Sequence, residues 1–163
     1  MTRFDPDLHH RHSIRLPDYD YSRVGVYAIT IVAQGHECLF GEVVNANVNL
    51  SRCGKIVRAA WFDLPKHYPH VELDVFCVMP EHAHGIVIVN TGDTAKRQPL
   101  SEIVRAFKSF SAQRINILRN TPGVAVWQRN YYEHIIRNNA DYLAQSAYIQ
   151  DNPINWGKDV EDW

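Results

Sequence analysis

Along this chain, segments with the apolar spacing of strands alternate with segments that have the apolar spacing of helices. The order of these segments constrains the fold more than any other feature. Residues 24–32 (VGVYAITIV) are mostly apolar and β-branched, which predicts a central strand buried on both faces. Residues 71–79 and 82–89 alternate or become apolar throughout, so each is predicted to be a strand. The two residues between them, Pro80 and Glu81, indicate a tight turn. Residues 124–136 are predicted to be extended as well.

Three other stretches have helical spacing. Apolar residues recur every three or four positions between residues 53 and 64, and again over residues 99–117. Ser51 is the expected N-cap of the first helix, and Pro65 is expected to end it. Asn138 is the expected N-cap of the last helix, which Pro153 is predicted to stop near Asn152.

These elements predict an α+β fold in a single domain. Residues 38–50 are predicted to form a hairpin that turns at residues 45–47. Without this hairpin, the remaining elements follow the order βαββαβ with a helix appended. This is the order of a ferredoxin-like antiparallel sheet with helices on one face. Residues 1–22 are irregular and polar, so we expect an N-terminal arm before a domain spanning residues 23–163.

Composition excludes several classes of protein. The chain has 163 residues, 45% of them hydrophobic, and no apolar run near the roughly 20 residues of a membrane span. The polar N-terminus lacks an apolar signal segment, so the expected location is the cytoplasm. The cysteines, Cys38, Cys53 and Cys77, form no CxxC pair and are expected to be buried, reduced thiols.

The net charge is only −1, but basic residues are concentrated in one region. Residues 96–137 contain eight basic and two acidic residues, an excess of six positive charges. Such an excess can attract a polyanion to one face of the molecule, although a solvated helix face is an equal alternative. Arg105 and Lys108 are the candidate phosphate contacts, and we expect the basic residues to form one face near the metal-binding motif described next.

The sharpest motif is His82-Ala83-His84 at the start of a predicted strand. Side chains alternate along a strand, so both imidazoles are expected on one face. Paired imidazoles suit a divalent transition ion and leave positions open for substrate. A second motif pairs Tyr148 with Asn152, one helical turn apart on the last helix. A tyrosine hydroxyl can attack phosphorus when a cation supports its ionised form.

Five segments together resemble the REP-associated tyrosine transposases, a group of single-tyrosine HUH transposases that act on single-stranded DNA. FCVMPEHAHGIVIV (76–89) resembles the HUH signature, in which two histidines flank a variable residue. The other segments are similar to further family blocks and follow in the same order. They are LSEIVRAFKSFSAQRIN (100–116), WQRNYYEHIIRN (127–138) and YIQDNPINW (148–156), and the opening HRHSIRLPDYDYS (10–22) is similar to the start of many members.

The resemblance implies a role for each matching residue. His82, His84 and Asn152 would hold a divalent metal, magnesium or manganese, and Tyr148 on the C-terminal helix would be the nucleophile. The implied activity is that of a single-stranded DNA endonuclease and strand transferase that forms a 5′-phosphotyrosine link. Hairpin-forming palindromic repeats are the implied substrate, bound by a monomer or homodimer. The candidate DNA-contacting residues are Arg105, Lys108, Arg11 and Arg15.

Two other functions fit parts of the sequence. A ferredoxin-like module that only binds nucleic acid would stack bases on sheet aromatics, but the strand that bears His82 and His84 has no aromatic pair. A metal-dependent hydrolase would use water instead of a tyrosine. Among nearby residues, Trp127, Tyr142 and His134 are expected to serve packing more than chemistry.

Overall fold

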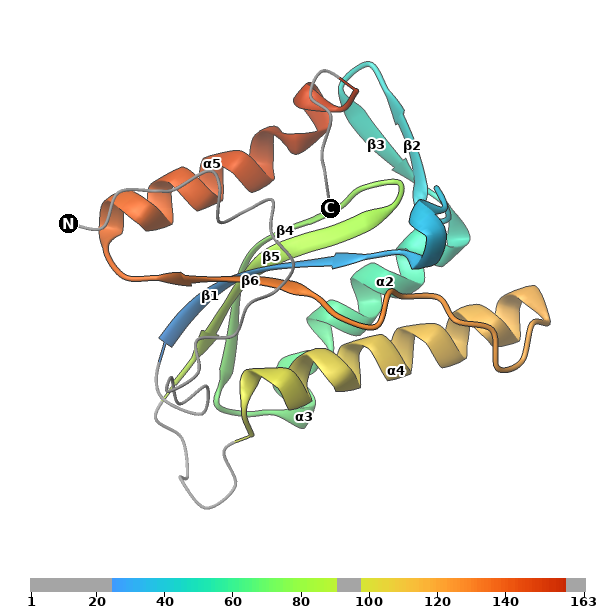
Figure 1. The fold of residues 1–163 in the computed structure, drawn as a ribbon, viewed down its shortest axis with the longest axis horizontal. Coiled ribbons are helices and arrows are strands. Elements are labelled where there is room, and N and C mark those ends of the chain that lie inside the picture. The colour runs from blue at the N-terminus through green and yellow to red at the C-terminus, as the bar shows by residue number, and fades with distance from the viewer. Residues whose placement is uncertain (1–24, 91–97, 158–163) are drawn as a thin grey trace.

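A four-stranded antiparallel sheet forms the centre of the protein in the computed structural model, which describes residues 25–90 and 98–157. The strands are β1 (Gly25–Val32), β4 (Val71–Val78), β5 (His82–Val89) and β6 (Tyr132–Ile136), in the order β4-β5-β1-β6 (Figure 1). With β1 and β5 inside the sheet, the two most apolar segments occupy the two central positions. This is the strand order of the ferredoxin-like fold, as the sequence predicted.

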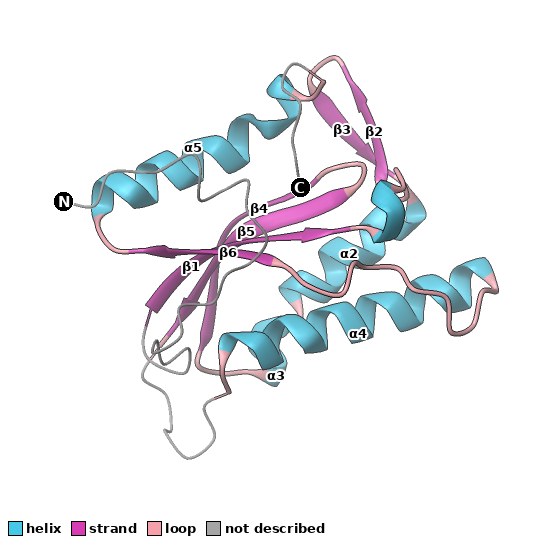
Figure 2. Ribbon diagram, viewed as in Figure 1, coloured by secondary structure: helices cyan, strands magenta, loops and turns pink. Residues whose placement is uncertain are grey.

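Helices cover both faces of this sheet (Figures 1 and 2). Helices α2 (Arg52–Phe62) and α4 (Leu100–Arg119) pack on one face, and α5 (Asn139–Asn155) crosses the other. The larger core lies under α2 and α4 and takes Ala83 and Val87 from β5, whereas Ile86 joins a smaller apolar cluster with Ile149 of α5. The alternation along β5 therefore directs His82, His84 and Ile86 toward α5.

Short elements connect these layers where the sequence predicted them. The hairpin consists of β2 (Gly41–Val44) and β3 (Asn47–Leu50), and its two turn residues, Asn45 and Ala46, have φ angles of 52° and 61°. The Ser51 side chain accepts a hydrogen bond of 3.0 Å from the backbone N–H of Gly54 and so caps α2. A 3-10 turn (Gln34–His36) and a short helix α3 (Leu64–His67) complete the chain path.

Two proline predictions need correction. Helix α2 ends at Phe62, before Pro65, which instead lies in the first turn of α3, where its missing N–H removes no helical hydrogen bond. Pro153 lies inside α5, which continues to Asn155. Proline has no backbone N–H, so the intrahelical hydrogen bond from this position is missing. The extended segment 124–136 also contains less strand than predicted, since β6 begins at Tyr132.

Two other predictions have opposite outcomes. Cys53 is buried as expected and Cys77 is half-buried, but Cys38 is exposed because it lies in the loop before β2. Trp127 is a core anchor as predicted: it is 7% exposed, and its indole N–H donates to Ser111 Oγ at 2.9 Å. The proposed arm at residues 1–22 lies outside the described residues. No helix in the described part of the chain is long and apolar enough to cross a membrane.

Candidate active site

The paired histidines begin β5 directly after a tight turn. The Met79 N–H donates to the His82 carbonyl at 2.7 Å, which closes the turn around Pro80 and Glu81. His82 and His84 then point to the same face of the sheet, and their ring centroids lie 4.9 Å apart. Both residues are buried, with exposures of 0% and 2%. The prediction that the two imidazoles share one face is confirmed.

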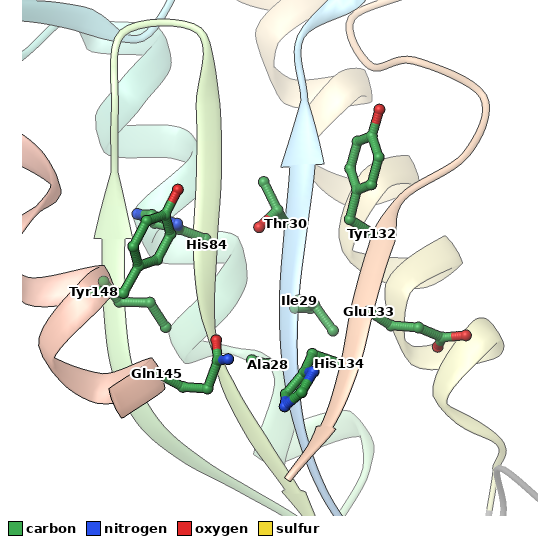
Figure 3. Close-up of a pocket in the computed structure, with 10 residues that line it drawn as sticks. Ala28, Ile29, Thr30, His84, Tyr132, Glu133, His134, Gln145 and Tyr148 are labelled. Carbon is green, nitrogen blue, oxygen red and sulfur yellow. The ribbon is translucent and has the colours of Figure 1, made fainter. Parts of the chain in front are cut away.

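Helix α5 places its own motif over these histidines. The Asn152 Oδ1 lies 3.2 Å from Nε2 of His82, and the Tyr148 ring centroid lies 5.8 Å from that of His84. Asn152 is 2% exposed, whereas Tyr148 is half-buried at the edge of a pocket between α5 and the sheet. Figure 3 shows the Tyr148 ring over His84, with its hydroxyl directed away from the helix. The four residues that the sequence singled out therefore meet.

Burial determines the charge state of the two histidines. Desolvation lowers the pKa of His82 to about 3, against a smaller opposing effect of its hydrogen bond to Asn152. Desolvation lowers the pKa of His84 well below its usual value, and the neighbouring His82 adds to the effect. Both imidazoles are consequently neutral at pH 7, which is the form that can bind a metal.

The side chains of His82, His84 and Asn152 carry nitrogen and oxygen atoms that are suitable ligands for a divalent ion. Both ring nitrogens of His84 are buried without a hydrogen-bond partner among the described residues, which is costly unless a ligand binds there. Two donors that share an ion at about 2.1 Å and at right angles lie about 3 Å apart, close to the distance between His82 and Asn152. Within the described ranges, no cluster of three or more His, Cys, Asp or Glu side chains is suited to a metal, so the third ligand would be an amide oxygen.

Two polar residues that were not predicted to belong to the site lie on the same face of α5 as Asn152. Asp141 and Gln145 are 4% and 2% exposed and, with Asn152, form a buried polar stripe at helical spacing. Asp141 accepts hydrogen bonds of 2.8 and 2.9 Å from Nε2 of His134 on β6. The signal was present in the sequence, because Asp141, Gln145 and Asn152 are polar residues at helical spacing. His134 thus holds α5 against β6 through this hydrogen bond, in agreement with the packing role expected of it.

A second hydrogen bond holds the same end of α5 to the opposite edge of the sheet. The Tyr142 hydroxyl donates to Asp74 Oδ2 at 2.6 Å, and Asp74 lies at an irregularity in β4 between Leu73 and Phe76. This hydrogen bond raises the pKa of Tyr142, which favours the protonated hydroxyl. The first turns of α5 are therefore tied to both edge strands, and this fixes the direction in which the helix carries Tyr148.

The two basic candidates on α4 lie elsewhere. Helix α4 packs on the sheet face opposite α5, so Arg105 and Lys108 are not beside the histidines as expected. Arg105 pairs with Glu102 at 2.7 Å, and Lys108 donates to three backbone carbonyls in the loop before β6 at 2.8–3.2 Å. Their contact with DNA remains a prediction. Arg11 and Arg15 lie outside the described residues.

The histidine pair on the sheet thus lies beneath the tyrosine-bearing helix, as the resemblance to the transposase family implied. A solved REP-associated tyrosine transposase bound to a REP hairpin has the same fold, with a TM-score of 0.64, 24% identity and coverage of 92% of this chain and 80% of that chain. A transposase from Escherichia coli named for the same family is 34% identical over 56% of this chain and 51% of its own length.

Two proteins of Haemophilus influenzae match most of the chain. One, an uncharacterized protein, is 38% identical over 97% of this chain and 96% of its own length. The other is provisionally named a REP-associated tyrosine transposase and is 25% identical over 88% of this chain and 80% of its own length. No protein-family model matches the chain. The chain therefore has homologues named REP-associated tyrosine transposases and shares the fold of a solved one.

Proposed function

We propose that this protein is a metal-assisted endonuclease and strand transferase for single-stranded DNA, with Tyr148 as its nucleophile. The observation that carries this proposal is the double pairing between β5 and α5. His84 faces Tyr148 and His82 faces Asn152, so a candidate nucleophile and a candidate metal site meet at one edge of a pocket.

The reaction conserves the phosphodiester energy. The Tyr148 hydroxyl oxygen attacks phosphorus and its proton passes to solvent, while the bond from phosphorus to the 3′-oxygen breaks. The 3′-oxygen takes up a proton and leaves as a free hydroxyl, and the downstream strand stays joined to Tyr148 through its 5′-phosphate. Attack by a second 3′-hydroxyl on this phosphotyrosine reverses the step, joins two strands and releases the tyrosine.

The residues of the site have different roles in this reaction. A magnesium or manganese ion bound by His82, His84 and Asn152 would polarise the scissile phosphate and offset its charge. The buried histidines stay neutral, so their nitrogens are available at physiological pH. The hydrogen bonds at the start of α5 orient the helix and limit the movement of Tyr148.

The proposed substrate is a hairpin formed by a palindromic repeat with single-stranded flanks. This part of the proposal rests on the relatives, one of which is seen bound to a REP hairpin. The metal and the strand-transfer step rest on the site residues of this chain. A monomer or a homodimer is compatible with the proposal.

The test uses hairpin oligonucleotides labelled at one end. With manganese present, the 3′-labelled fragment should move to protein size on a denaturing gel, and the 5′-labelled fragment should not. Tyr148→Phe should abolish this adduct, with a loss of several orders of magnitude in cleavage, because the variant removes only the attacking oxygen. Tyr68→Phe is the matched control, since Tyr68 packs against the core on the other face of the sheet.

Three results are informative. An adduct that requires Tyr148 supports the proposal. Cleavage by Tyr148→Phe without any adduct means that water is the nucleophile and that the protein is a metal-dependent hydrolase. Binding without cleavage by the wild-type protein, with every divalent ion tried, means that the chain is a nucleic-acid-binding module.

A further inference from the structure

A groove of about 410 Å³ lies next to the site and has no role in the reaction described above. It runs between the β2–β3 hairpin, the end of α2, the edge strand β4 and the last turns of α5. Asn47 lines it from the hairpin, Arg58 and Phe62 from α2, and Gln150 and Ile154 from α5. Its volume is within the range of pockets that hold small organic groups.

This groove and the candidate active site are built from two shared elements, α5 and the β4–β5 strand pair. On α5, Gln150 falls between Tyr148 and Asn152 in the chain but points to the groove. On β4, Cys77 lines the groove and is also the cross-strand neighbour of His84. A strand whose phosphate lies against Tyr148 therefore has the groove within reach of its neighbouring nucleotides.

The aromatic lining of the groove is exposed to solvent. The Phe62 side chain is 52% exposed, although its ring packs edge-on against Phe76 at 6.3 Å between centroids. The Arg58 guanidinium lies over the Phe62 ring, 5.8 Å from its centroid, and so makes a cation–π contact with it. Phe76 is itself stacked on the buried Trp61 at 4.3 Å, which gives the exposed ring rigid support. An exposed ring beside an arginine is the kind of surface on which a nucleobase stacks.

The polar part of the lining matches the same ligand. Asn47 and Gln150 carry amides, which donate and accept hydrogen bonds as the edges of bases do. Arg58 is the charged residue among the described lining residues, and no carboxylate occurs among them. The groove therefore combines an apolar floor with a positive charge, which suits one base of a polyanionic strand.

We propose that this groove binds an unpaired nucleobase of the DNA strand that flanks the phosphate attacked by Tyr148. The proposal rests on the proposed function, because it assigns a subsite to that substrate. Phe62 provides the stacking surface, Arg58 faces the adjoining phosphate or base, and the two amides contact the base edge. Phe62 and Arg58 are thus binding residues and take no part in the chemical step.

The test uses the non-cleaving Tyr148→Phe protein and hairpin oligonucleotides that carry one 5-iodouracil at successive positions of the single-stranded flank. Irradiation should cross-link one or two adjacent positions to Phe62, as identified by mass spectrometry of the digested complex. Phe62→Ala should weaken binding of the flanked hairpin by roughly fivefold to a hundredfold, the range of one lost stacking contact. Phe62→Trp should restore it, and Ile117→Ala, at an exposed position on α4, should bind as the parent does.

The possible outcomes separate this proposal from the proposed function. If wild-type protein forms the Tyr148 adduct while Phe62→Ala binds and cleaves equally well, the nucleobase site is wrong and the function stands. If Phe62→Ala changes the molecular mass in solution without changing DNA affinity, the groove is an interface between copies and the proposal is overturned. If Phe62→Ala does not fold, cross-linking to the parent and binding by Arg58→Gln decide the question. A failure of wild-type protein to bind DNA contradicts the function itself.

Discussion

Asn152 Oδ1 lies 3.2 Å from Nε2 of His82, although 70 residues separate the two in the chain. One strand and one helix account for the whole arrangement. Two residues along β5 advance about 6.8 Å, and four residues along α5 advance about 6 Å. The spacing of the histidines therefore matches the spacing of Tyr148 and Asn152, and each pair can meet when the helix runs along the strand in the opposite direction.

Metal binding should depend on Asn152. Addition of manganese to the metal-free protein should raise its unfolding free energy, by about 2.7 kcal/mol at a concentration a hundred times the Kd. Asn152→Ala should remove most of this increase, because one of three protein ligands is lost. Asn155→Ala, at an exposed position one turn nearer the C-terminus, is the control. An undiminished manganese effect in Asn152→Ala would show that Asn152 is not a ligand.

The metal-free protein should lose stability as the pH falls below about 6.5. Burial lowers the pKa of His82 to about 3 and that of His84 well below its usual value. Below the usual histidine pKa, the unfolded chain binds protons that the folded chain excludes, so acid favours unfolding. Each such group contributes up to about 1.4 kcal/mol per pH unit in this range.

Urea unfolding between pH 8 and pH 5, in the presence of a chelator, measures this slope. His84→Asn should reduce it, since an amide takes up no proton in this range. His67→Asn, at an exposed histidine on α3, controls for the loss of an imidazole. The burial argument is wrong if His84→Asn and the wild-type protein have equal slopes.

Lys108 should contribute to stability more than Arg105 does. Lys108→Met removes a charged donor from three backbone carbonyls, and the expected loss is about 1–3 kcal/mol. Arg105→Gln breaks only an exposed ion pair with Glu102 and should leave the unfolding midpoint nearly unchanged. Equal effects of the two variants in thermal unfolding would contradict this assignment.

Arg105→Gln also tests the predicted phosphate contact without disturbing the loop held by Lys108. If Arg105 contacts a phosphate of the single-stranded flank, the slope of log affinity against log salt should fall by about 0.7 or less. Binding isotherms at several salt concentrations measure this slope. An unchanged slope would identify Arg105 as a solvent-facing charge on α4.

The hydrogen bonds at the start of α5 should affect the rate of cleavage more than DNA binding. Tyr142→Phe removes the donor to Asp74 and should cost about 1 kcal/mol of stability, because the hydrogen bond is partly exposed. Adduct formation should become slower but remain detectable, with an unchanged Kd for the hairpin. A cleavage rate equal to that of the wild type would show that this bond does not position Tyr148.

Much of this protein could be predicted from local sequence. Three local features could be predicted without a structure because they depend only on neighbouring residues. They are the β-branched run of β1, the cap at Ser51 and the two-residue turn before β3. The period of a strand placed His82 and His84 on one face of β5, and the period of a helix placed Tyr148 and Asn152 on one face of α5. The strand order follows from these elements because few topologies accommodate βαββαβ.

Tertiary structure decided what no local pattern contains. The sequence could not show that α5 lies over the histidines while α4 packs on the opposite face, which separates Lys108 from the site. Nor could it show that Pro153 is accommodated within α5, or that His134 meets Asp141. Each of these depends on contacts between segments distant in the chain. Spacing along the sequence fixes the face that a residue occupies on its own element, but only packing fixes what that face meets.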